Sequence, residues 1–185
     1  MDNVDDAIRT YALSVEQIGS SIAHLRGIPL LEALKHTEIG AGPYDDVSLF
    51  EAANRIMTDL VILHGVRWML KKRTFPFKTY LVEYGNDDEN GFDIRAEHDG
   101  KILIGEAFNV AKSFFSTKRG AMLKKLRNLK ADFRILIFNH DAVKTRYVPE
   151  TGPGEHFVLV DVGSESAKVV PNLPLERTVA LKEFQ

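Results

Sequence analysis

The segment of residues 91–106 constrains the fold of this chain most tightly. It contains two stretches of strand-forming residues separated by Asp99-Gly100, a dipeptide typical of the tight turn of a β-hairpin. If these two residues form the turn, Asp93 lies directly opposite Glu106. Cross-strand partners project from the same face of a sheet, with Cβ atoms about 5 Å apart. The pattern therefore predicts two carboxylates side by side.

Two like charges placed so closely repel, so some compensation is expected. A divalent cation is a natural candidate, because Mg²⁺ binds through one or two carboxylates together with phosphate oxygens. Asp93 alternates with Phe92 and Ile94, however, and alternation also explains a solvent-facing strand residue. Glu106 shares its strand face with apolar residues, so we expect it to be partly buried and to need a partner. That partner is either a metal ion or a Lys or Arg side chain.

Composition indicates one globular domain over residues 1–185, since 44% of the residues are hydrophobic and 27% are charged. The chain has no cysteine, which excludes disulfides, zinc–thiolate sites and thiol nucleophiles. The acidic N-terminus lacks the basic start and apolar run of a signal peptide. No apolar run approaches the roughly 20 residues that span a bilayer. We therefore expect a cytoplasmic protein without a membrane partner.

Charge is segregated along the chain, although the net charge is only −2. Residues 83–99 contain seven acidic side chains and one Arg, whereas residues 107–131 contain seven basic side chains and no acidic one. A basic stretch that follows a carboxylate pair suits an anionic ligand held near a metal ion. The alternative is a solvated helix face, which is the usual place of such a charge run.

Hydrophobic periodicity predicts an α/β (α+β) fold with a central mixed sheet. Helices are expected over residues 4–25, 30–35, 46–72 and 112–129, and strands over residues 78–84, 91–97, 101–110, 133–139, 156–162 and 168–170. The helix over 46–72 is apolar around most of its girth, which is typical of a core helix or of a subunit interface. We expect Asp45 or Asp46 to cap its start and Pro76 to end it.

This order of elements, with its carboxylates, resembles the core of the PD-(D/E)XK nuclease superfamily, the restriction-endonuclease-like fold. That core is a helix, a three-stranded meander, a second helix and a further strand. An Asp lies on the second strand and a Glu-x-Lys on the third. Asp93 matches the motif Asp and Glu106 matches the motif Glu. Glu51 resembles an additional acidic residue that many members carry on the first core helix.

The chain departs from the motif at Phe108, which stands where the superfamily has Lys. Members can supply that Lys from a neighbouring helix, and Lys112 is the best substitute. The resemblance covers roughly residues 46–140. Residues 1–45 would form a helical N-terminal addition, and residues 141–185 a C-terminal strand and tail.

The resemblance implies metal-dependent hydrolysis of phosphodiester bonds in DNA. Asp93, Glu106 and the backbone carbonyl of Ala107 would hold one or two Mg²⁺ or Mn²⁺ ions. Lys112 would position the attacking water or neutralise charge, and Glu51 would complete the catalytic group. Phosphates flanking the cut would be bound by four basic residues of the second helix, namely Lys118, Arg119, Lys124 and Lys125.

Two other functions are compatible with the same residues. A catalytically inactive member of the fold would bind nucleic acid through the basic helix without cutting it. A structural protein would use the apolar helix 46–72 as a homodimer interface, with Glu51 at the helix surface near Arg55. Affinity for DNA that falls with salt separates these two, and metal-dependent cleavage separates a nuclease from both.

Overall fold

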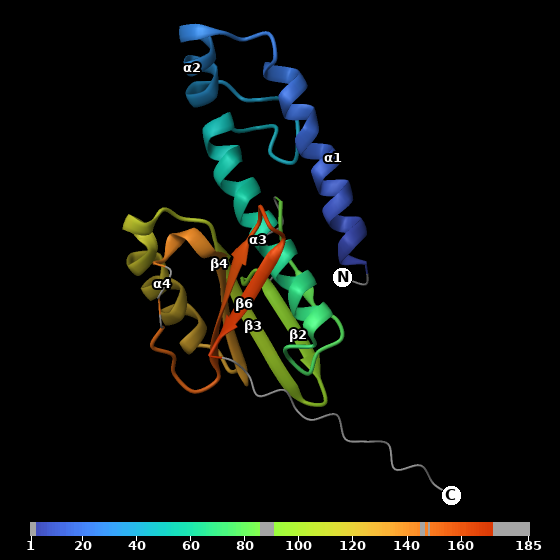
Figure 1. Ribbon diagram of the computed structural model, residues 1–185, viewed down its shortest axis with the longest axis vertical. Coiled ribbons are helices and arrows are strands. Elements are labelled where there is room, and N and C mark those ends of the chain that lie inside the picture. Colours follow the sequence, from blue (N-terminus) through green and yellow to red (C-terminus); the bar gives the residue numbers. More distant parts are fainter. Residues whose placement is uncertain (1–2, 86–90, 145–146, 148, 172–185) are drawn as a thin grey trace, which may run out of the picture.

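The computed structural model describes residues 3–85, 91–144, 147 and 149–171 of the chain. Within these residues, the chain forms four α-helices and one mixed six-stranded sheet (Figure 1). The helices are α1 (Val4–Ile22), α2 (Gly27–His36), α3 (Leu49–Lys72) and α4 (Lys112–Arg127). The strands are β1 (Leu81–Val82), β2 (Ile94–His98), β3 (Lys101–Phe108), β4 (Phe133–Asn139), β5 (Glu155–Asp161) and β6 (Ser166–Val170), with a 3₁₀ turn, η1 (His140–Ala142), after β4. The prediction of a mixed sheet with helices packed on it is confirmed.

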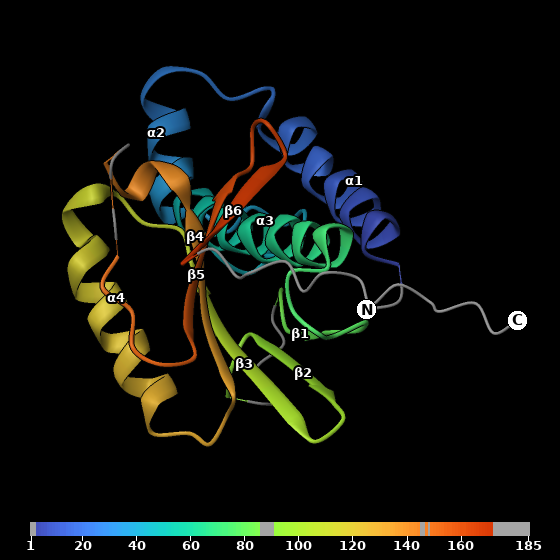
Figure 2. The same ribbon diagram turned by 60° about the horizontal axis from the view of Figure 1, so that its bottom comes forward.

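The strands lie in the sheet in the order in which they occur in the chain. β1, β2 and β3 form an antiparallel meander, β4 and β5 run parallel to β3, and β6 is antiparallel to β5. α4 is the crossover that joins β3 to the parallel strand β4. Figure 2 shows α4 on one face of the sheet and α3 on the other.

The hairpin register predicted from the turn dipeptide is confirmed, since Ile94 pairs with Gly105 and the remaining pairs follow to the turn. Asp99 and Gly100 both have positive φ angles, 49° and 72°. Two successive positive φ angles are the requirement of a type I′ turn, which Asp-Gly meets well. β2 begins at Ile94 rather than at residue 91, so Asp93 lies one position before the paired residues.

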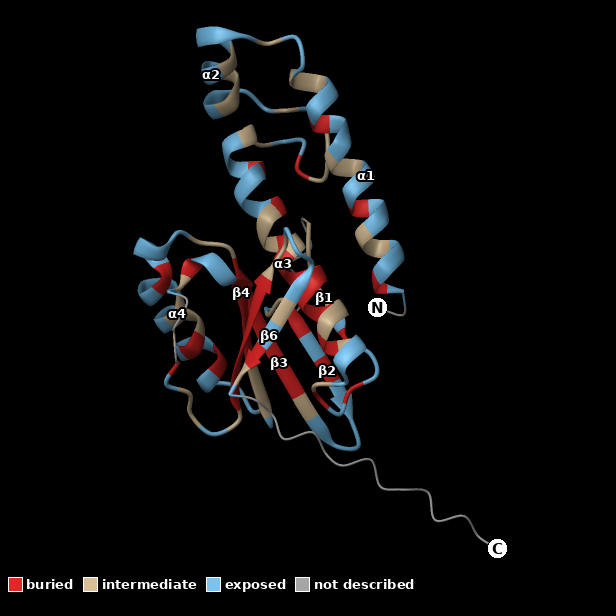
Figure 3. Ribbon diagram, viewed as in Figure 1, coloured by how far each residue is buried: buried red, intermediate tan, exposed pale blue. Residues whose placement is uncertain are grey.

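Two apolar clusters fill the space between the sheet and its helices. On one face, Val61, Val66 and Met69 of α3 pack against the sheet, and on the other Phe115 and Leu126 of α4 do so. Figure 3 shows the central strands buried along most of their length. Ten residues of α3 are buried. The helix is apolar around most of its circumference because it lies in the core.

Several expected boundaries differ from the structure by a few residues, among them the start of α3 and the extent of the first strand of the meander. Ser48, not Asp45 or Asp46, caps α3, because its hydroxyl accepts a hydrogen bond from the backbone N–H of Glu51. The first strand of the meander has only two residues instead of the expected 78–84. Phe77 and Tyr80, which precede this short strand, are both buried in the cluster under α3.

The N-terminal helices lie beside α3, away from most of the sheet (Figure 1). α1 contacts α3 through Tyr11 and Ile18, whereas α2 buries none of its residues. Within the part of the chain described, no helix combines the length and apolar character needed to cross a lipid bilayer.

Candidate functional site

Asp93 and Glu106 meet where the hairpin joins the body of the sheet. Glu106 is only 4% exposed, and Asp93 is half-buried. The Oδ2 atom of Asp93 accepts a hydrogen bond of 2.6 Å from the backbone N–H of Ala107, the residue that follows Glu106. The hairpin therefore brings the two carboxyl groups together, and the hydrogen bond fixes the orientation of one of them.

The position of Ala107 follows from the alternation of β3. Ile104 and Phe108 belong to the cluster under α4, whereas Ala107 belongs to the cluster under α3, so Glu106 projects on the α4 face. The N–H and C=O of one strand residue point towards the same neighbouring strand. The Ala107 N–H points to Asp93, which directly precedes β2. The carbonyl oxygen of Ala107 therefore also points towards the β2 edge of β3.

Lys125 of α4 lies against this carboxylate pair. Its Nζ atom is 2.7 Å from the Oε1 atom of Glu106, and its side chain is 43% exposed. The amine thus reaches from the solvent-facing side of the helix to a carboxylate that is almost fully buried. Lys118, which is two turns earlier on α4, adds a second positive charge near both carboxyl groups.

Burial is the main influence on the acidity of both carboxyl groups. It raises the pKa of Asp93, and the Ala107 N–H and the nearby lysines oppose that rise. Burial also raises the pKa of Glu106, with Lys125 opposing the rise and the charge of Asp93 adding to it. Both groups therefore carry an electrostatic cost when ionised that a further cation would relieve.

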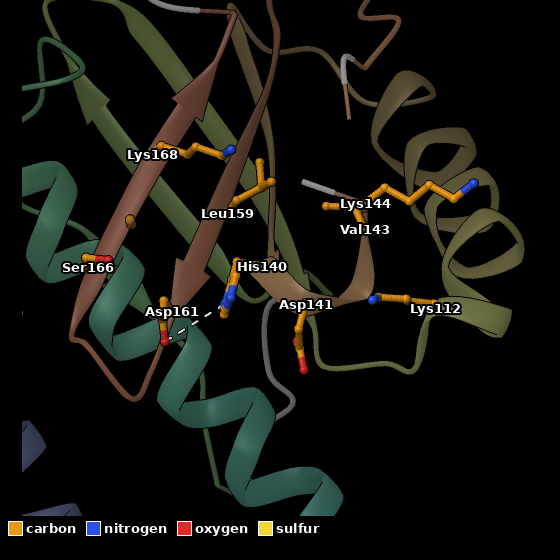
Figure 4. Close-up of a pocket in the computed structure, with 10 residues that line it drawn as sticks. Lys112, His140, Asp141, Val143, Lys144, Leu159, Asp161, Ser166 and Lys168 are labelled. Atoms are coloured by element: carbon orange, nitrogen blue, oxygen red, sulfur yellow. Dashed lines mark ion pairs between the residues drawn. The ribbon is translucent and has the colours of Figure 1, made fainter. Parts of the chain in front are cut away.

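Lys112 lies elsewhere, in a cavity of about 470 Å³ at the C-terminal ends of β4 and β5. Figure 4 shows the amines of Lys112 and Lys168 pointing into this cavity, while that of Lys144 points away. Neither member of the carboxylate pair is among the described residues that line it. The charged and polar residues around the cavity are of mixed character, namely Lys112, His140, Asp141, Lys144, Asp161, Ser166 and Lys168.

Glu51 does not join the carboxylate pair either. It lies in the first turn of α3 with its side chain half exposed, and it forms an ion pair with Arg55, as expected for a helix-surface residue. Across the ranges that the structure describes, no group of three or more His, Asp or Glu side chains could hold a metal ion. The site is thus a pair of carboxylates with one neighbouring backbone carbonyl.

The remaining predicted phosphate ligands differ in their exposure to solvent and in their hydrogen bonds. Lys118 and Lys124 are exposed on α4. Arg119 is half-buried and donates a hydrogen bond of 2.9 Å to the hydroxyl of Tyr147, which ties α4 to the segment after η1. Three acidic residues of the expected charge cluster, Asp87, Asp88 and Glu89, lie outside the described residues.

Sequence reasoning missed the contact of Lys125 with Glu106. The available signal was the spacing of Lys118 and Lys125, which are seven residues apart and therefore share one side of a helix. That helix is the crossover from β3, and a crossover helix covers the face of the sheet from which Glu106 projects.

Comparison with known proteins identifies no relative of this chain. No model of a protein family, no curated protein and no solved structure matches this chain.

Proposed function

We propose that this protein is a metal-dependent nuclease of the PD-(D/E)XK type, which hydrolyses phosphodiester bonds in DNA. The observation that carries the proposal is the meeting of Asp93 and Glu106 beside the amine of Lys125. The succession of α3, the meander β1–β3, α4 and β4 supports it, because the superfamily core has the same order of elements.

The donor set fits a hard divalent cation such as Mg²⁺ or Mn²⁺, which prefers oxygen ligands. Asp93, Glu106 and the carbonyl of Ala107 would hold it. Lys125 and Lys118 place positive charge near the pair, but burial still raises the pKa of both carboxyl groups, so a deficit of positive charge remains at the pair. A divalent cation would remove that deficit and lower the pKa of both carboxyl groups.

The residues around the carboxylate pair would each have a role in phosphodiester hydrolysis. The bound ion would lower the pKa of a water molecule and neutralise charge on the phosphate. The Ala107 N–H holds the Asp93 carboxylate in place. Lys125, rather than the expected Lys112, is the lysine beside the carboxylates, and it would contact the phosphate or the attacking water.

The test is cleavage of supercoiled plasmid and of labelled single-stranded DNA with Mn²⁺. Asp93→Asn and Glu106→Gln should each lower the rate about 100-fold or more, and a chelator should abolish cleavage by the parent. Asp141→Asn is the matched control, because it removes an acidic group from the neighbouring cavity instead. Cleavage by both site variants at the parental rate would overturn the proposal.

The same assay distinguishes the two lysines. Lys125→Ala should slow cleavage by at least about 10-fold, since it removes the cation nearest the pair, and Lys112→Ala should have a smaller effect. A larger loss in Lys112→Ala than in Lys125→Ala would show that the sequence motif, and not this geometry, identifies the catalytic lysine.

One observation favours a second candidate function. Phe108 is buried in the apolar cluster under α4, at the position where the superfamily has its Lys. A member that lost catalysis would still bind DNA through the basic side of α4. Such a protein would show salt-dependent DNA binding but no cleavage above the level shared by the site variants.

A further inference from the structure

One side of α4 carries an exposed aromatic ring in line with two lysines. Phe114 is 66% exposed, although it is a large hydrophobic residue. Lys118 and Lys125 follow four and eleven residues later. At 3.6 residues per turn, the three side chains fall within about 40° of one another around the helix axis. We call Phe114, Lys118, Ala121 and Lys125 the α4 stripe.

The core of the protein does not explain this placement of Phe114. The next residue, Phe115, is 6% exposed and packs on Phe108 and Phe138. Together with Leu123 and Leu126 it supplies the buried side of α4. The ring of Phe114 is therefore exposed beside basic residues and is available to a ligand.

The stripe leads to the candidate site. At one end, Lys125 contacts Glu106 at 2.7 Å. Between Phe114 and Lys125, Lys118 is exposed, and its charge opposes the rise in pKa that burial causes in both carboxyl groups. Phe114 forms the other end, about 16 Å from Lys125 along the helix axis at 1.5 Å per residue. A ligand lying along the stripe would therefore reach the carboxylate pair.

Aromatic rings interleaved with basic side chains are the usual surface for single-stranded nucleic acid. A base can stack on the ring while the neighbouring phosphates lie against the amines. In a duplex the faces of the bases are already occupied by stacking, so an exposed ring gains this contact only with an unpaired base. The charge of the stripe suits the phosphates, since residues 107–131 contain no acidic side chain.

We propose that the α4 stripe binds single-stranded nucleic acid, with an unpaired base stacked on Phe114 and adjoining phosphates at Lys118 and Lys125. The inference rests on the proposed function, of which it names the substrate form. The protein would then cut single strands, or single-stranded regions of a larger DNA, in preference to continuous duplex.

The test is fluorescence anisotropy with a labelled oligothymidine and with a duplex of the same length, in a chelator so that no cleavage occurs. The parent should bind the single strand more tightly than the duplex. Phe114→Ala should weaken single-strand binding about 10-fold and leave duplex binding within about 2-fold, because a stacking contact is lost. Phe114→Trp should retain the parental affinity for the single strand.

Phe50→Ala is the matched control, since Phe50 is 70% exposed in the first turn of α3, on a different helix. It should leave both affinities unchanged. Lys118→Ala should weaken both and reduce the dependence of affinity on salt by about one phosphate contact.

The outcomes separate this inference from the proposed function. If Phe114→Ala binds the single strand as well as Phe50→Ala does, base stacking on the stripe is wrong. Metal-dependent cleavage in the assay above would still support a nuclease. If the parent binds duplex more tightly than the single strand, the stated substrate form is also wrong. If no nucleic acid binds in the chelator, binding by the α4 stripe is wrong, and the cleavage assay with Mn²⁺ decides the proposed function separately.

Discussion

The amine of Lys125 lies 2.7 Å from a carboxylate oxygen of Glu106, and this contact joins α4 to β3. It explains how a carboxylate that is 4% exposed is tolerated beside a second acidic group. Because the lysine is partly in water, solvent screens the attraction between the two charges.

Lys125→Met should destabilise the metal-free protein by about 1–2 kcal/mol at pH 8, since Glu106 loses its cation while it stays buried. Burial raises the pKa of Glu106, so the carboxyl group takes up a proton and loses its charge as the pH falls. The cost of the substitution should therefore shrink between pH 8 and pH 5. Urea denaturation at both pH values measures it, with exposed Lys124→Met as the control. An equal cost in the two variants would contradict the account.

Asp93→Asn should be at least as stable as the parent without metal. The substitution removes a half-buried charge next to Glu106, and the amide oxygen can still accept the Ala107 hydrogen bond. The pKa of Asp93 is raised in the folded state, so the charge penalty of the parent exists above that pKa and is lost as the pH falls through it. The advantage of the variant should therefore be largest near neutral pH.

Mn²⁺ should raise the melting temperature of the parent more than that of Asp93→Asn, because a ligand that binds the folded state stabilises it by mass action. Thermal melts with and without the ion measure the difference. Equal shifts in the two proteins would show that Asp93 is not a ligand.

A second buried carboxylate anchors the N-terminal helix α1 to α3. Asp59 of α3 is 3% exposed and accepts hydrogen bonds from the hydroxyls of Tyr11 on α1 and Tyr44 before α3. Tyr11→Phe should cost about 1–3 kcal/mol, because it leaves a buried carboxylate short of a donor. Burial raises the pKa of Asp59, so the cost should fall as the pH drops and the group becomes neutral. In an Asp59→Asn background the same substitution should cost less, and an equal cost would contradict this assignment.

Two helical glycines should respond in opposite ways to alanine. A Cβ at Gly65 would lie 2.8 Å from Cγ2 of Ile137, where α3 crosses β4, whereas a Cβ at Gly120 would meet nothing within 4 Å. Gly65→Ala should therefore destabilise the fold by about 1–3 kcal/mol through overpacking. Gly120→Ala should stabilise it by about 0.5–1 kcal/mol through helix propensity. Chemical denaturation of both variants checks this, and stabilisation by Gly65→Ala would show that the packing there is loose.

Features of the fold that depend on the local sequence, such as strand bounds and hairpin register, were predictable. The strand over Phe133–Asn139 was predicted with its observed bounds, because a continuous apolar run is flanked by polar residues. The hairpin register was predictable because Asp99-Gly100 permits one tight turn geometry. Glu106 was expected to be buried from the apolar residues on its strand face, and it is.

The parts that depend on tertiary packing were not predictable. The burial of Phe77 and Tyr80 under α3, just before the short strand β1, cannot be inferred from their spacing. On α4, Leu123 is buried, whereas Leu129 lies beyond the end of the helix, although helix was expected to residue 129, and is 38% exposed. The contact of Lys125 with Glu106 depends on where α4 crosses β3, and a single sequence does not specify that crossing.

Direct binding of Mn²⁺ tests the central claim, that Asp93 and Glu106 form a metal site. The electron paramagnetic resonance signal of free Mn²⁺ would be followed during titration at neutral pH, for the parent, Asp93→Asn, Glu106→Gln and the control Asp141→Asn. The parent and the control should bind the ion, and both site variants should bind it at least about 10-fold more weakly. Equal binding by all four proteins, or by none of them, would contradict it.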